Sequence, residues 1–388
     1  MKNTKFTFLS FLVFLVTVSS SYGQQDTTLT GATGRKVITT AVPFLSITPD
    51  ARAGGMGDVG AATSPDANST YWNPAKTVFS EEEQAFALSY TPWLGKIVND
   101  MWIFYGSYYR KISKEQAISG SFRYFDLGEI FLTEDGVNGR DFKPKELAIT
   151  LSYSRMLSQN LSIGLNGKYI HSNLIGNFTS SSGNLEAKPG NSVAADIGVY
   201  YNQDILRGSN SNLALAAVIS NIGAKISYSD ENNKDFIPTN LRLGAAFTTS
   251  LDPYNKLTFG LDFNKLMVPS PQADGSENDK SLLSGMFGSF GDAEGGFSEE
   301  MQEVAISGGV EYWYNDTFAG RIGYFYEAEE KGNRKYLTLG LGFRYQRFGI
   351  DFAYLVPQEQ EHPLAETLRF SLLFNFEKSS VVEESITD

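Results

Sequence analysis

Beyond residue 84, the hydrophobic residues of this chain recur with a period of two and not with the 3.6 of a helix. In the run 257–263, large apolar residues alternate with Thr258, Gly260 and Asp262, and the run 368–376 alternates in the same way. One side of each run is apolar and often aromatic, whereas the other side is small, polar or charged. This alternation predicts β-strands with one apolar and one polar face.

Fourteen such runs can be counted, each of about ten residues, which is the strand length that crosses a membrane in a barrel. They are 84–92, 100–111, 115–127, 145–157, 160–173, 191–202, 212–224, 238–250, 255–266, 303–314, 317–328, 335–346, 347–356 and 366–376. Short turns such as 158–159 and 315–316 alternate with long connections such as 128–144, 174–190 and 267–302. An even number of strands, with short turns at one end and long loops at the other, predicts an all-β fold: an antiparallel transmembrane β-barrel of the outer-membrane type.

The polar side of the strands carries charges of both signs, which suits a lumen where opposite charges can pair. These residues are Arg123, Lys168, Asp196, Arg242, Asp262, Arg321, Arg344, Asp351 and Arg369. Fourteen strands enclose a lumen too wide to be filled by their own side chains, so a plug or a channel is expected. A soluble β-protein is the alternative, because aromatic strands also form ordinary cores.

The first 23 residues have the pattern of a secretion signal. Lys2 and Lys5 precede an apolar run of 13 residues, 6–18, and small residues lead to a plausible cleavage position at Gly23. Thirteen residues are too few for a helix that spans a bilayer, so the segment is predicted to be a signal peptide for export.

Composition excludes several kinds of chemistry. The 388-residue chain has no cysteine and only two histidines, His171 and His362, which leaves no thiolate nucleophile and little for a metal site or a Ser-His pair. A net charge of -12 argues against a nucleic-acid partner, which requires a basic face. We therefore expect no enzyme activity, no cofactor and no metal.

Residues 24–83 do not alternate and are rich in Gly, Ala, Asp, Asn and Pro. Three glycines in 51–60 match G-x-G-x-x-G, but no βαβ unit follows, so tight backbone packing in a narrow space is the better interpretation. The stretch 51–60, followed by Asn73, Pro74 and Ala75, resembles the N-terminal hatch of FadL-like outer-membrane proteins. Taken with the residues of 43–61 and 71–76, this stretch resembles more specifically the PorV family, the FadL-like component of the type IX secretion system.

This resemblance implies a fourteen-stranded barrel in the outer membrane, closed by a hatch that includes the Asn73-Pro74-Ala75 turn. The expected division is a signal peptide (1–23), a periplasmic extension and lumenal hatch (24–83), a barrel (84–376) and an acidic periplasmic tail (377–388). The resemblance also implies export and surface attachment of cargo with C-terminal secretion domains. The implied partners are a large translocon barrel, a sortase-containing attachment complex and outer-membrane lipid. It implies no catalytic residues.

The connection 267–302 is a candidate docking loop, since it combines many acids with apolar residues at Leu282, Leu283, Met286, Phe287 and Phe290. Their spacing predicts a short helix that collects them on one face, although two glycines weaken it. Apolar residues on an exposed loop usually mark a contact, but they could instead fold back across the barrel mouth. The alternative function is a FadL-type transporter of long-chain fatty acids or other hydrophobic compounds.

Overall fold

The structure is a computed structural model that describes residues 36–376, apart from 96–99, 134–138, 177, 180–185, 206–209, 230–233, 273–275 and 359–366. The predicted signal peptide (1–23) and acidic tail (377–388) lie outside the described residues. So do residues 24–35 of the predicted extension.

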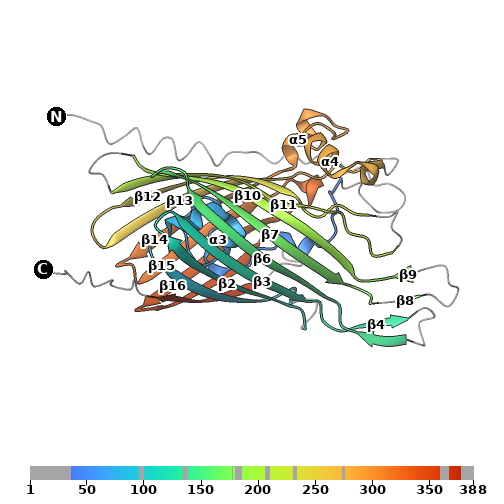
Figure 1. Cartoon of the computed structure of the whole chain (residues 1–388), viewed down its shortest axis with the longest axis horizontal. Coiled ribbons are helices and arrows are strands. Elements are labelled where there is room, and N and C mark those ends of the chain that lie inside the picture. The colour runs from blue at the N-terminus through green and yellow to red at the C-terminus, as the bar shows by residue number, and fades with distance from the viewer. Residues whose placement is uncertain are drawn as a thin grey trace, which may run out of the picture. The chain divides into compact units, whose positions relative to one another are not determined.

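Fourteen antiparallel strands close into a barrel, with β1 paired to both β2 and β18 (Figure 1). The strands are β1 (Gln84–Pro92), β2 (Trp102–Ser113), β3 (Gln116–Asp126), β6 (Lys145–Met156), β7 (Leu161–Asn173), β10 (Gly190–Asp204), β11 (Ser211–Gly223), β12 (Asn240–Ser250), β13 (Asn255–Leu266), β14 (Val304–Tyr314), β15 (Phe318–Tyr326), β16 (Lys335–Tyr345), β17 (Phe348–Pro357) and β18 (Leu368–Phe376). The predicted fold class and strand number are confirmed, and each predicted boundary lies within two residues of an observed one.

Because neighbouring strands are antiparallel, connections alternate between the two ends of the barrel. The end that carries the long connections is called here the long-loop end, and the opposite one the short-turn end (Figure 1). The long connections hold β4 (Ile130–Thr133), β5 (Gly139–Phe142), β8 (Phe178–Thr179), β9 (Glu186–Ala187), η3 (Ser276–Asp279), α4 (Leu282–Gly288), α5 (Phe297–Gln302) and η4 (Glu329–Lys331). Among the described residues, none of the helices is long and apolar enough to cross a membrane.

The alternation read from the sequence puts large apolar side chains on the outside of the wall. On β13, Phe259, Leu261 and Phe263 are exposed, whereas Thr258 and Asp262 between them are buried in the lumen. A soluble protein has the opposite arrangement, with its large apolar side chains inside. Here the outer face contacts the hydrocarbon of a bilayer, so the apolar side chains lie outside.

Residues 41–80, called here the lumenal segment, run through the barrel from one end to the other. The Ala41 N–H donates to Phe236 O (2.9 Å) at the long-loop end, and Lys111 Nζ donates to Ser80 O (2.9 Å) at the short-turn end. The segment contains η1 (Pro43–Ser46), α2 (Ala51–Gly54), α3 (Ser69–Trp72) and η2 (Pro74–Phe79). The lumen is thus filled by the chain's own residues, as the width of a fourteen-stranded barrel requires.

Glycines let the lumenal segment approach the wall backbone to backbone. A Cβ on Gly323 of β15 would lie 2.0 Å from the carbonyl carbon of Met56, and one on Gly309 of β14 would lie 2.2 Å from Met56 O. Gly57, which follows Met56, adopts a φ of 71°, a conformation that side chains disfavour. The glycine pattern in 51–60 therefore serves close packing, as predicted from the sequence.

Candidate functional site

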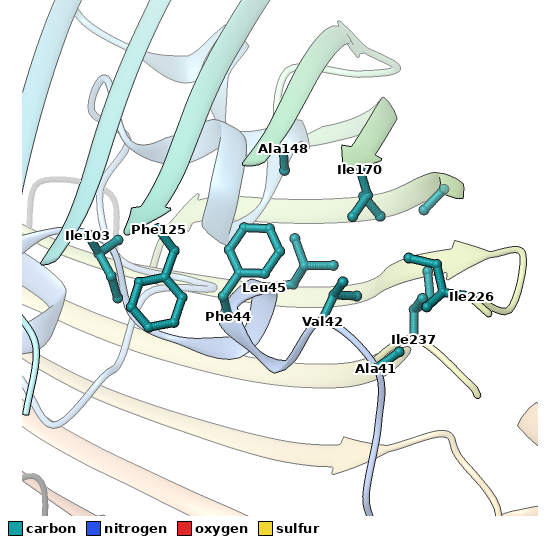
Figure 2. Packing of buried hydrophobic residues seen from close by; sticks show 11 residues of the cluster. Ala41, Val42, Phe44, Leu45, Ile103, Phe125, Ala148, Ile170, Ile226 and Ile237 are labelled. Carbon is teal, nitrogen blue, oxygen red and sulfur yellow. The ribbon is translucent and has the colours of Figure 1, made fainter. Parts of the chain in front are cut away.

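An apolar cluster lies at the long-loop end of the lumen (Figure 2). Phe44 and Leu45 on η1, with Val42 directly before it, pack against wall residues from five strands and the β11–β12 connection. The wall residues are Ile103, Phe125, Ala148, Ile170, Ala194, Ile226 and Ile237. The apolar part of the lumen is therefore occupied by the chain itself.

A buried chain of ion pairs holds the middle of the lumenal segment to the wall. Arg52 of α2 donates to both carboxylate oxygens of Glu311 on β14, at 2.9 and 2.8 Å. Arg321 Nε donates to Glu311 (2.7 Å) and its Nη1 to Asp351 (2.8 Å), which also accepts from Arg344 (2.7 Å). Bidentate arginine–carboxylate pairs of this kind combine strength with a fixed geometry. Of the lumenal charges predicted from the sequence, Arg321 and Arg344 pair with Asp351, and Lys168 pairs with Asp196.

Two aspartates extend this polar attachment. Asp262 on β13 accepts the backbone N–H groups of Gly60 (2.8 Å) and Ala61 (2.9 Å). Asp58 of the lumenal segment accepts from Tyr336 (2.5 Å) and Arg369 (3.3 Å) on the wall. The segment is thus attached mainly through charged and polar groups below its apolar end.

The lumenal segment also has a polar interior, which surrounds a small cavity. Asp50 accepts from Trp72 Nε1 (2.6 Å) and from Ala53 N (3.0 Å), and Lys76 Nζ donates to Gly60 O (2.7 Å). The charged groups of Asp50 and Lys76 therefore find hydrogen-bond partners within the segment itself.

The predicted hatch motif, Asn73-Pro74-Ala75, is fully buried where η2 begins. Asn73 Oδ1 accepts from Ala75 N (3.0 Å) and Asn73 Nδ2 donates to Val199 O (3.1 Å) on β10, while Ser162 Oγ on β7 donates to Ala75 O (2.6 Å). A Cβ on Gly164 would lie 2.3 Å from Ala75 N. The turn therefore attaches the segment to β7 and β10, and its role as a hatch element stays a prediction.

The predicted docking loop forms the expected helix, α4, but its apolar residues divide into a buried and an exposed group. Met286 is only 3% exposed and Leu282 is half-buried, whereas Leu283, Phe287 and Phe290 are 61%, 67% and 48% exposed. On a helix the five residues span an arc of about 140°, and only one edge of that arc contacts the barrel rim. The expectation of one uniform face needs this correction, and their role in docking stays a prediction.

Two further apolar residues of the same connection are exposed; Phe297 was visible in the sequence as an apolar residue of this loop but was not among the docking candidates, and Met301 was missed. Phe297 and Met301 on α5 are 79% and 54% exposed. We call Leu283, Phe287, Phe290, Phe297 and Met301 the exposed stripe. A signal was present, since Phe297 and Met301 stand four residues apart in the same long connection, at helical spacing.

In the part of the chain that the structure describes, no group of three or more His, Cys, Asp or Glu residues could hold a metal ion. His171 lies on the outward side of β7, where Nδ1 is 2.8 Å from Asn191 Oδ1. His362 lies outside the described residues.

Comparison with known structures shows the fold that this chain shares. It is similar to the toluene transporter TodX of Pseudomonas putida, with 12% identity and a TM-score of 0.50 over 85% of this chain and 99% of TodX. It is also similar to a FadL homologue of Pseudomonas aeruginosa, with 12% identity and a TM-score of 0.47 over 85% of this chain and 99% of that protein. No curated protein matches the sequence.

A family profile gives the more specific result. The family described as "Type IX secretion system protein PorV" matches residues 30–273, which is well over half of the chain. The match includes Asn73, Pro74 and Ala75 and stops before α4. Together with the closed barrel and its apolar outer face, it indicates an outer-membrane protein. The resemblance read from 43–76 is confirmed: this chain belongs to the PorV family of type IX secretion system proteins.

Proposed function

We propose that this protein is a non-enzymatic adaptor of the type IX secretion system, which binds the translocon and cargo with C-terminal secretion domains for export and surface attachment. The observation that supports this most directly is the exposed stripe on α4 and α5. It is a group of large apolar side chains on a loop outside the barrel wall proper.

Exposed apolar side chains gathered on one surface usually mark a contact. Here the loop is already held in place, because Met286 is buried and Gly285 lies against Phe236 and Pro269 at the barrel rim. A surface fixed before binding loses little conformational entropy when a partner docks. The stripe therefore has both the chemistry and the rigidity of a docking surface.

The lumen supports an adaptor better than a conduit. In a transporter of hydrophobic compounds, the apolar part of the lumen would have to receive the ligand. Here Val42, Phe44 and Leu45 occupy that region, and ion pairs such as Arg52–Glu311 lie below it. We propose that the lumenal segment, including Asn73, Pro74 and Ala75, is a hatch that seals the barrel.

The proposed partners are the large translocon barrel, the sortase-containing attachment complex and the cargo. Outer-membrane lipid surrounds the apolar band of the wall. In this arrangement the long-loop end faces the outside of the cell, because bacterial barrels place their long loops there. The signal peptide 1–23 and the periplasmic tail 377–388 belong to the same proposal.

The test is the double variant Leu283→Ser/Phe287→Ser. Burying each side chain in an interface contributes about 1.5–3 kcal/mol, so complete burial of both would make their loss worth roughly 3–6 kcal/mol to the complex. We expect normal amounts of folded protein in the membrane, with reduced co-purification of the translocon and reduced cargo export.

The matched control is Phe131→Ser on β4, which removes a side chain of similar exposure (55%) from another connection at the same end. It should leave export unchanged. Normal export by the double variant would exclude the stripe as the docking element. A deletion strain with normal export and lost uptake of long-chain fatty acids would favour the transporter.

A further inference from the structure

Helix α5 lies at the centre of a buried ion-pair cluster at the long-loop end. Glu299 and Glu300 of α5, with Glu303 directly after it, supply the carboxylates, and all three are nearly fully buried. Within the described residues they pair with lysines from three separate parts of the chain: Lys36, Lys265 and Lys331. We call these six residues the α5 cluster.

Two of the three lysines connect α5 to the barrel. Lys265, on the outward side of β13, donates to Glu300 (3.0 Å) and Glu303 (2.5 Å). Lys331, in the connection between β15 and β16, donates to Glu299 (2.7 Å) and Glu303 (3.0 Å). These pairs hold the helix on the rim.

The third lysine connects α5 to the start of the lumenal segment. Lys36 Nζ donates to Glu299 (2.9 Å), only five residues before Ala41. The hydrogen bonds from Lys331 and Lys36 outweigh burial and hold the pKa of Glu299 at about 2, so this carboxylate stays charged at physiological pH.

A second contact runs parallel to the first. The ring of Phe236 lies against Gly285 of α4, where a Cβ would be 2.6 Å from it, and the Phe236 carbonyl accepts the N–H of Ala41. Both helices of the docking loop thus contact groups that position residues 36–41. The exposed stripe shares these elements, because Phe297 and Met301 are on α5 and the Phe290 ring lies 5.7 Å from Lys265 Nζ.

We infer that the α5 cluster couples the exposed stripe to the lumenal segment: a force that displaces α5 also frees the segment at the long-loop end. The mechanical reason is that Glu299 cannot move away from the rim without breaking its pair with Lys36. The Glu299 side chain is only 8% exposed, so loss of a lysine partner leaves a buried carboxylate incompletely paired, and the loop and the start of the segment are expected to loosen together. This coupling does not depend on which partner docks.

The chain has no cysteine, so single cysteines can report accessibility in the full-length protein. Ser289→Cys is a nearly isosteric reporter of the loop, because Ser289 is fully buried. Ala41→Cys reports the start of the lumenal segment and Ser80→Cys its other end. Each is labelled with a water-soluble maleimide in detergent micelles, with and without Glu299→Gln/Glu303→Gln. Glu294→Gln is the control, because its carboxylate is half-exposed and 3.6 Å from Lys36.

We expect the double variant to raise the labelling rates at positions 289 and 41 at least tenfold and to leave position 80 unchanged. Faster labelling at 289 with an unchanged rate at 41 would show that the loop moves independently, and no change at either would show that the cluster restrains neither. Both results overturn the inference.

If the double variant loosened the whole barrel, all three positions would be labelled faster. A second variant distinguishes this outcome from the proposed coupling. Lys36→Met removes only the link to the lumenal segment, so it should raise the rate at position 41 and leave positions 289 and 80 as they are. An unchanged rate at position 41 in Lys36→Met would refute coupling through this lysine.

Discussion

The lumenal segment and the α4–α5 loop place charged and apolar side chains in opposite ways. In the lumenal segment, charged residues such as Arg52 and Asp50 are buried, and they hold the segment to the wall and to itself. In the loop, large apolar residues such as Phe287 and Phe297 are exposed, and charges at the base hold the helix down. In a barrel surrounded by lipid, burial alone therefore does not mark the apolar residues.

The same difference separates residues that hold the fold together from residues that are free to bind a partner. Each face of the lumenal segment has partners on the wall, so a change there should affect assembly of the whole barrel. The exposed edge of α4 has no described contact that depends on Leu283 or Phe287, so a change there should affect binding only. The predictions below test this distinction.

The largest expected effect is that of Glu311→Ala. This carboxylate lies between Arg52 and Arg321, and its removal leaves two buried guanidinium groups with half of their partners. Removing one member of a buried ion pair typically costs about 3–5 kcal/mol. Urea unfolding of the purified barrel should show a loss of this size. Glu294→Ala, in the exposed part of the loop, is the control, and a loss below about 1 kcal/mol for Glu311→Ala would contradict the role given to the ion-pair chain.

A smaller but cleaner comparison uses two glycines of β15. Gly323 faces the lumenal segment, where a Cβ would clash with the backbone of Met56, whereas Gly320 faces outward with no atom within 4 Å of its would-be Cβ. Overpacking typically costs about 1–3 kcal/mol. Gly323→Ala should therefore lower the yield of folded, heat-modifiable barrel, and Gly320→Ala should not. Equal yields would mean that the segment can shift to admit a methyl group.

The wall could be predicted from the sequence, because the period of two leaves little freedom once one face must contact lipid. The lumenal segment could be predicted only as a compact, glycine-rich element. Its contacts, such as Asp262 with the N–H groups of Gly60 and Ala61, join residues about 200 positions apart and leave no local pattern. Aromatic residues near strand ends are also ambiguous: Tyr108 is exposed on the outer face, but the adjacent Tyr109 faces the lumen and donates to Glu82 O. Its place on the inward phase of β2 is the signal that would have shown this.

The smallest expected effect on unfolding of the barrel distinguishes the two edges of α4. Met286 is buried against the rim and Phe287 beside it is exposed, so the pair differs mainly in burial. Removing a buried side chain of this size costs up to about 2–5 kcal/mol where the surroundings are rigid, and the cost here should remain local to the loop. Met286→Ala should therefore expose the connection between β13 and β14 to limited proteolysis, with little change in barrel unfolding. Phe287→Ala should leave both the proteolysis pattern and the free energy of unfolding within about 0.5 kcal/mol of the wild type. If Phe287→Ala also exposes the loop, then Phe287 supports the fold of the loop, and its side chain is not free to bind a partner.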